Sequence, residues 1–182
     1  LYNYGGIYLD SDIETLKNFD NLLNCDCFFG YEYSGLPEAA VIGAIPKLKW
    51  IQNILYFYES KNFKNADGSL NKIVAPLVVK YYFEKTENAK LLDDGTIHRN
   101  KRFTVYPNDF FSPKNPFKTN EINVTENTIC IHHFNAGWVN MNFVNKLKKQ
   151  IHLFLIMLLG KLNYNKLMYK IRPDLKISSI GR

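Results

Sequence analysis

The chain has 182 residues, of which 46% are hydrophobic and 15% aromatic, and its formal net charge is +6. This composition supports a packed core and excludes a disordered chain. Three cysteines, an odd and sparse number, argue against a disulfide scaffold and indicate a reducing compartment. Cys25 and Cys27 lack the two-residue spacer of a zinc knuckle, so we expect no zinc there.

The positive charge is concentrated in the last part of the chain. Residues 146–182 contain nine Lys or Arg and one acid, Asp174, whereas the preceding 145 residues contain fourteen bases and sixteen acids. The body therefore carries −2 and the remainder +8. This distribution argues against a body that binds nucleic acid.

The N-terminal segment predicts a turn, a short strand and then two acids. Residues 1–4 resemble the last turn of a helix, and Gly5 and Gly6 suit a helix stop with positive φ. Residues 7–9 are apolar and predict a short buried strand that ends at Asp10. Because an α/β nucleotide-binding domain has strands and helices before such a turn, we expect the N-terminal part of the domain to precede this segment.

The remaining elements follow from apolar patterns and from proline and glycine positions. Strands are predicted at residues 28–33, 103–106 and 128–133, and residues 39–44 predict either a buried strand or a turn that passes close to a ligand. A helix is predicted to start at Pro46 and to bury a face made of Leu48, Ile51, Leu55 and Tyr58. A second helix is predicted after Pro76.

We divide the chain into a catalytic domain at residues 1–143 and a basic, partly apolar helical tail at residues 144–182. Residues 151–159 are apolar except for His152, and a bilayer span needs about 20 such residues. A helix of this kind could contact an anionic membrane surface through residues 146–170, or pack on the domain with its basic side in solvent. The sequence leaves both alternatives open.

The two acids Asp10 and Asp12 carry the chemical argument. In an extended segment, residues two apart project to the same side, so both carboxylates can face one ion. Mg²⁺ or Mn²⁺ is held in proteins by one or two carboxylates together with substrate phosphates. Such an ion neutralises charge on a departing diphosphate. Tyr8 could face a base or a sugar, although a packing role is favoured.

The twelve residues Leu1 to Asp12 resemble the signature of glycosyltransferase family thirty-two, which contains Och1-like mannosyltransferases and bacterial capsular-polysaccharide transferases. The resemblance continues through Gly43 and Pro46, Ala75-Pro76, residues 103–113, and the run from Ile131 to Trp138. Two positions depart from the family pattern: Ala75 replaces a usual Gly, and Gly137 replaces a usual Ser.

This resemblance implies an α/β, GT-A type (Rossmann-like) fold that binds a UDP- or GDP-sugar with Mn²⁺ or Mg²⁺ and transfers the sugar with retention. It implies that Asp10 and Asp12 are catalytic and bind the metal. A histidine completes the metal site, and position favours His132 over His133. The donor-binding residues that it implies are Gly5, Gly6, Tyr8, Asp10 and Trp138.

The expected acceptor is a surface glycan or glycolipid, made in the cytoplasm at the inner face of a bacterial membrane. Glu14 and Glu38 are candidate acceptor-side carboxylates, and no catalytic base is assigned. Two other functions stay open. One is a toxin-like glycosyltransferase that modifies a host protein, and the other is an inactive, truncated remnant that binds a sugar nucleotide.

Overall fold

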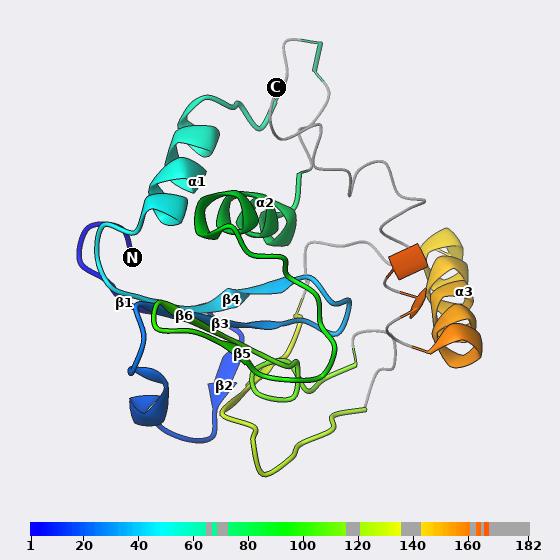
Figure 1. Cartoon of the computed structure of the whole chain (residues 1–182). Coiled ribbons are helices and arrows are strands. Elements are labelled where there is room, and N and C mark those ends of the chain that lie inside the picture. Colours follow the sequence, from blue (N-terminus) through cyan, green and yellow to red (C-terminus); the bar gives the residue numbers. More distant parts are fainter. Residues whose placement is uncertain are drawn as a thin grey trace.

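The computed structural model describes residues 1–64, 67–68, 73–115, 121–135, 143–160, 163–164 and 166–167. These residues form a five-stranded sheet, a two-stranded sheet and three α-helices (Figure 1). The larger sheet has the strand order β1 (Gly6–Leu9), β4 (Pro37–Ala44), β3 (Cys27–Tyr31), β6 (Phe103–Tyr106) and β5 (His98–Arg99). The smaller sheet pairs β2 (Ile13–Thr15) with β7 (Cys130–His132).

The larger sheet is mixed, which confirms the predicted α/β class. Strand β3 runs parallel to β6, whereas the other neighbouring strands of this sheet are antiparallel. The helices α1 (Lys49–Glu59) and α2 (Ala75–Glu87) cover one face (Figure 1). The short 3₁₀ helix η1 (Asp20–Leu22) and β2 lie on the other side of the sheet. The GT-A assignment itself remains a prediction.

An aromatic core fixes the helical layer to the sheet. Phe29 of β3 meets Phe83 of α2 edge-to-face, with ring centroids 4.9 Å apart, and Trp50 of α1 packs 5.6 Å from Phe83. Phe103 of β6 is a further edge-to-face partner of Phe83, at 4.9 Å. Each fully buried aromatic side chain contributes roughly 1.5–3 kcal/mol, so these four rings hold both layers in one arrangement.

A second cluster lies under the opposite face and supports the strands that carry the polar residues described below. It consists of Leu22, Phe28, Val41, Tyr106, Phe110, Phe111 and Cys130. Gly43 of β4 allows Phe28 to lie flat against the sheet, because a Cβ there would be 2.0 Å from a carbon of the ring. The backbone of β4 therefore passes close to this cluster.

The N-terminal strand differs from the prediction. Ile7 and Leu9 are 36% and 38% exposed, so the expectation of a buried strand is wrong. The reason is position: among the described strands β1 pairs only with β4, at the edge of the sheet. The predicted positive φ at Gly5 and Gly6 is confirmed, at 67° and 99°.

The first helix also begins later than predicted. It starts at Lys49, because Lys47 has a φ of 66° and interrupts the helical path after Pro46. Pro46 instead packs on the N-terminal turn, where a Cβ on Gly5 would be 2.9 Å from the proline ring. Of the predicted core face, Leu55 and Tyr58 are exposed, and the buried positions are Leu48, Trp50, Ile51 and Phe57.

The last described helix, α3 (Phe143–Leu159), lies beside the layered part of the molecule (Figure 1). Gly160, with a φ of 73°, follows its last residue. Among the described residues, no helix is long and apolar enough to cross a membrane. The strands predicted at residues 28–33, 103–106 and 128–133 each overlap a strand of the structure, and residues 39–44 lie within β4.

Candidate metal and donor site

A tight turn directly after β1 places the two aspartates. The N–H of Asp10 continues the β1–β4 ladder by donating to Ala40 O at 3.0 Å. The chain then reverses, and the N–H of Ile13 donates to Asp10 O at 3.2 Å, which closes the turn. The residues from Asp10 to Asp12 are therefore not extended as expected, and the turn, rather than the alternation of a strand, brings the two carboxylates together.

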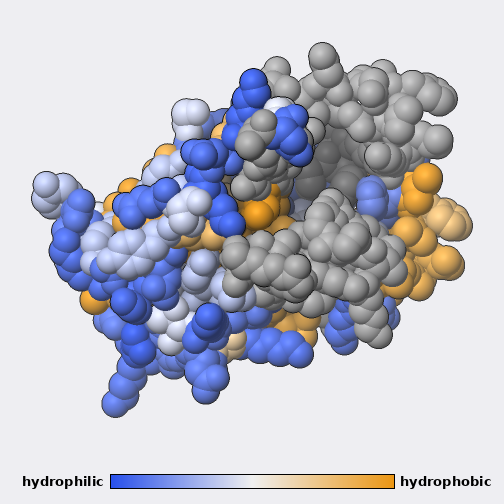
Figure 2. Space-filling model, turned by 90° about the horizontal axis from the view of Figure 1, so that it is seen from above, coloured by the Kyte–Doolittle hydropathy of each residue, from blue (hydrophilic) through white to orange (hydrophobic). Residues whose placement is uncertain are grey.

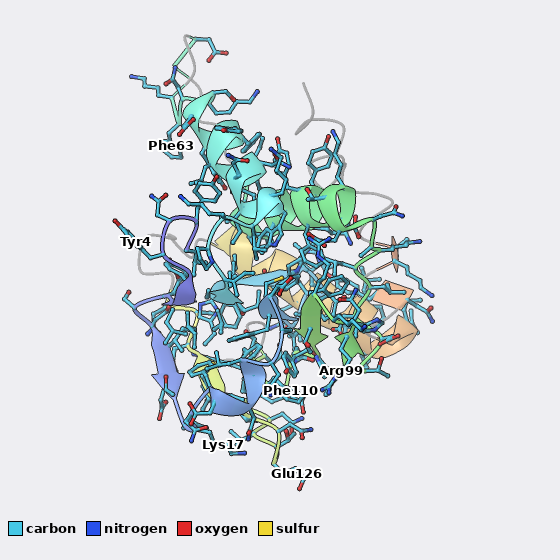
Figure 3. The ribbon with its side chains drawn as sticks, turned by 60° about the vertical axis from the view of Figure 1, so that its left-hand side comes forward. Tyr4, Lys17, Phe63, Arg99, Phe110 and Glu126 are labelled. Carbon is cyan, nitrogen blue, oxygen red and sulfur yellow. The ribbon has the colours of Figure 1, made fainter. Side chains whose placement is uncertain are left out.

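Strand pairing brings the histidine to this turn from the other end of the chain. In the β2–β7 ladder Ile13 is paired with His132, and the N–H of His133 donates to Asp12 O at 3.1 Å. The pairing extends past Thr15, where the N–H groups of Leu16 and Lys17 donate to Ile129 O. Figure 3 shows Lys17 beside Glu126, whose carbonyl oxygen accepts a hydrogen bond from its ammonium group.

Asp10, Asp12 and His132 form a compact cluster. Each offers one ligand atom, and these atoms all lie within 4.8 Å of one another. His132 Nε2 is 3.5 Å from Asp12 Oδ1. The Tyr8 hydroxyl donates to Asp10 Oδ1, and the N–H of Asn135 donates to Asp12 Oδ2 at 2.8 Å. Both carboxylates are thus held by a partner outside the cluster.

Glu38 orients the histidine from behind. Its side chain is only 3% exposed, and its Oε2 lies 3.1 Å from His132 Nδ1. The same oxygen accepts a hydrogen bond from the Ser112 hydroxyl, while Oε1 accepts the N–H of Ala40 at 2.9 Å. A carboxylate at Nδ1 favours a proton on that nitrogen, so Nε2, which lies on the side of Asp12, is the nitrogen that could bind a metal ion.

The cluster is electrostatically suited to a cation. Burial lowers the pKa of His132, but the hydrogen bond to Glu38 and its negative charge, together with the charges of Asp12 and Asp10, raise it overall. The imidazole is 12% exposed, so these charges are only partly screened by water. A positive charge is therefore stabilised at this point of the molecule.

The residues present fit a divalent metal ion. Two carboxylates and one imidazole are ligands of Mn²⁺, whereas Mg²⁺ prefers oxygen ligands alone. A metal-binding histidine usually donates its other ring N–H to a carboxylate, and Glu38 is that carboxylate for His132. Metal sites of this kind commonly leave positions for water or substrate oxygens.

The structure separates the two histidines and the two further acids. His133 Nε2 lies 2.8 Å from Glu14 Oε2, away from the aspartates. Glu14 is 53% exposed, whereas the buried Glu38 has both oxygens occupied. Glu38 is thus a support of His132 and not an acceptor-side carboxylate. Sequence reasoning had no signal for Ser112, which completes this group.

One predicted site residue, Trp138, lies outside the described residues, as does Gly137, which departs from the family pattern. Gly5 and Gly6 shape the turn before β1, where the N–H of Gly5 donates to Leu1 O at 2.7 Å. Tyr8 is 47% exposed and touches the cluster through its hydroxyl group.

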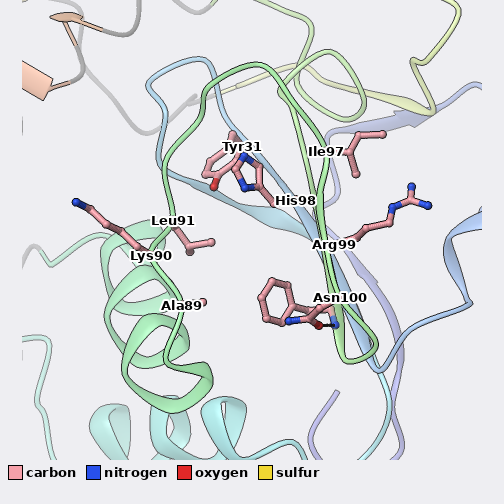
Figure 4. Close-up of a pocket in the computed structure, with 9 residues that line it drawn as sticks. Tyr31, Ala89, Lys90, Leu91, Ile97, His98, Arg99 and Asn100 are labelled. Atoms are coloured by element: carbon pink, nitrogen blue, oxygen red, sulfur yellow. Dashed lines mark hydrogen bonds between the residues drawn. The ribbon is translucent and has the colours of Figure 1, made fainter.

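A cavity of about 400 Å³ lies elsewhere, between β5 and the segment that follows α2 (Figure 4). Its lining includes Tyr31, Lys90, Leu91, His98 and Arg99, and none of the clustered acids. The imidazole of His98 is 2.8 Å from Asp94 Oδ1. This cavity is therefore separate from the acidic cluster.

Comparison with known families gives a match at the N-terminal end of the chain. Residues 1–29 match the family described as a glycosyltransferase sugar-binding region containing a DXD motif. No curated protein and no solved structure matches the chain. The matched segment contains both aspartates of the cluster, and it suggests glycosyltransferase activity in general, with family thirty-two remaining a prediction.

Proposed function

We propose that this chain is the catalytic region of a metal-dependent glycosyltransferase that uses a nucleotide-sugar donor. The observation that carries the proposal is the convergence of Asp10, Asp12 and His132 within 4.8 Å. Two of these residues belong to the segment that matches the DXD-containing region. The third, His132, lies about 120 residues later in the sequence. An Asp-Ser-Asp that occurred by chance in a surface turn would not be expected to have a histidine beside it.

In the proposed site the carboxylates of Asp10 and Asp12 and the Nε2 of His132 would hold the cation. The ion, when bound, neutralises negative charge on the departing diphosphate. The Tyr8 hydroxyl and the Asn135 N–H hold the two carboxylates in place, so little rearrangement is needed on binding. Mn²⁺ is preferred over Mg²⁺ because of the imidazole.

We propose that transfer proceeds with retention. The bond from the anomeric carbon to the phosphate oxygen breaks, a bond to the acceptor oxygen forms, and the acceptor proton passes to the departing diphosphate. The described acids support this scheme, because Glu38 is buried behind His132 and Glu14 is paired with His133. Neither is positioned as a base at the metal cluster.

The finer assignments are also proposals. The donor is a UDP- or GDP-sugar, and the acceptor is a surface glycan or glycolipid assembled at the cytoplasmic face of the membrane. The resemblance of the first twelve residues to family thirty-two supports both, and the basic tail supports the location.

Donor hydrolysis in the absence of acceptor tests the proposal. The full chain is incubated with UDP- and GDP-sugars, each with Mn²⁺, Mg²⁺ or a chelator. We expect release of sugar from one donor class with metal, and its anomeric configuration by NMR reports retention. Asp12→Asn removes this activity, whereas the control Asp20→Asn, at an exposed position in η1, keeps it. Equal turnover by Asp12→Asn and the unmodified chain would refute the proposal.

A further inference from the structure

Helix α3 exposes a continuous apolar stripe. Ile151, Phe154, Met157 and Leu158 are 50%, 57%, 76% and 65% exposed. Spacings of three, three and one residues place all four on one side of a helix that has 3.6 residues per turn. Figure 2 shows the hydrophobic surface of this helix at one end of the molecule. We call these four residues the α3 stripe.

The other side of α3 is turned toward protein. The side chain of His152 is held by the Tyr164 hydroxyl, which lies 2.6 Å from its Nδ1, and the two rings meet edge-to-face. Tyr164 is itself only 5% exposed. Tyr164, whose N–H donates to Gly160 O at 3.0 Å, therefore lies against this side of the helix. The α3 stripe lies on the opposite side of the helix.

The charge around the stripe favours one kind of partner. Residues 146–182 contain nine Lys or Arg and one acid. Lys146, Lys148 and Lys149 precede the stripe in the sequence, and Lys161 follows it. Basic residues close to an anionic membrane surface are attracted to its negative potential. A second copy of the chain would bring the same positive charges together and is disfavoured.

We propose that the α3 stripe docks on a bilayer that contains anionic phospholipids. The helix lies in the plane of the surface, with the four apolar side chains among the acyl chains and the basic residues at the headgroups. Its 17 residues are too few and too charged to span the bilayer. The proposed occupant is a lipid surface, favoured by the basic residues on both sides of the stripe in the sequence.

Docking would tether the metal cluster to the bilayer and so limit the distance between them. The N–H of Asn135 is bonded to Asp12, and α3 begins eight residues later at Phe143. Eight residues span at most about 29 Å. A donor bound at the cluster is therefore held within reach of an acceptor whose carrier is anchored in the membrane.

Vesicle flotation of the full chain tests the docking directly. The probes are phosphatidylcholine vesicles with and without about 30% phosphatidylglycerol, at low and at high salt. We expect binding to the anionic vesicles, weakened by salt, and little binding to phosphatidylcholine alone. No metal or donor is present, so a failed glycosyltransferase proposal leaves this result unaffected.

Two Phe→Glu variants, one inside the α3 stripe and one outside it, test whether vesicle binding depends on the stripe itself or on any exposed aromatic side chain. Phe154→Glu puts a charge into the stripe and is expected to weaken vesicle binding about tenfold or more. Phe63→Glu makes the same change at a position that is 70% exposed but lies outside α3, and is expected to bind as the unmodified chain does. Unchanged thermal unfolding midpoints show that both variants are folded.

Three results would overturn the proposal. The first is that the chain does not bind anionic vesicles. The second is that Phe154→Glu and the unmodified chain bind these vesicles equally well. The third is that the unmodified chain is a dimer in solution, and that Phe154→Glu is a monomer with unchanged vesicle binding. The last result would assign the stripe to a second copy.

Discussion

Replacing Glu38 with Gln tests how His132 is held in the metal cluster. Oε2 of Glu38 receives the His132 Nδ1–H and the Ser112 hydroxyl, and Oε1 receives the Ala40 N–H. If the Gln oxygen keeps the Ala40 bond, its amide NH₂ faces His132. The imidazole must then accept at Nδ1 and carry its proton on Nε2, the atom that would bind the metal.

The expected loss in Mn²⁺ affinity is 10- to 100-fold, the usual effect of removing a partner of a metal-binding histidine, or about 1.4–2.7 kcal/mol. If the amide flips instead, its NH₂ faces the Ala40 N–H inside the protein, and folding stability falls by about 1–3 kcal/mol. Isothermal titration with Mn²⁺, combined with urea unfolding without metal, distinguishes the two outcomes.

Glu14→Gln is the matched control for this experiment. Glu14 also contacts a histidine, His133, at 2.8 Å, but outside the cluster and on the surface. We expect its Mn²⁺ affinity to stay within about twofold of the unmodified chain. The reasoning fails if Glu38→Gln also binds Mn²⁺ within twofold and unfolds at the same urea concentration.

Further predictions concern the core and the titratable side chains. Gly43→Ala pushes a methyl group into the Phe28 ring, and the free energy of unfolding in urea titrations should fall by at least about 1–3 kcal/mol. An unchanged unfolding midpoint would mean that the Phe28 ring can move to another position without cost. Burial and the nearby Glu38 charge raise the pKa of Glu32 to about 8, so its folded state binds a proton that its unfolded state, with a pKa near 4.3, does not. Stability should therefore fall as the pH rises from about 4.3 to 8, and Glu32→Gln should flatten that decline in thermal unfolding; equal slopes would contradict the pKa. A thiol reagent should modify Cys25 in the native protein and spare the two buried cysteines, whose pKa burial raises to about 12; mass spectrometry showing three early modifications would contradict this burial.

Local patterns predicted the elements of the sheet but not its edge. The apolar runs gave strands at β3, β4, β6 and β7, and Pro76 marked the start of α2 to within one residue. The exposure of β1 was not predictable, because periodicity cannot tell which strands lie beside a short apolar run. The position of Pro46 was also misread, because its role is set by contact with Gly5, a distant residue in the sequence.

The candidate site likewise has one part that the sequence predicts, the segment with the two aspartates, and one part that depends on the fold, His132 with Glu38. The Gly-Gly turn, the strand and the two aspartates are one continuous segment, so the sequence displays them together. Their approach to His132 depends on pairing between β2 and β7, each three residues long and more than a hundred residues apart. Glu38 was noticed as an acid, but its role depends on a buried contact that no spacing rule describes.

The central claim is that Asp10, Asp12 and His132 form a metal-dependent nucleotide site. A thermal-shift titration of the full chain with UDP and with GDP, each with and without Mn²⁺, tests it most directly, since a ligand that binds the folded state must raise its unfolding midpoint. We predict a shift that requires both Mn²⁺ and one of the two nucleotides, and that disappears in Asp12→Asn. A folded chain whose midpoint moves with no combination of metal and nucleotide would contradict the claim.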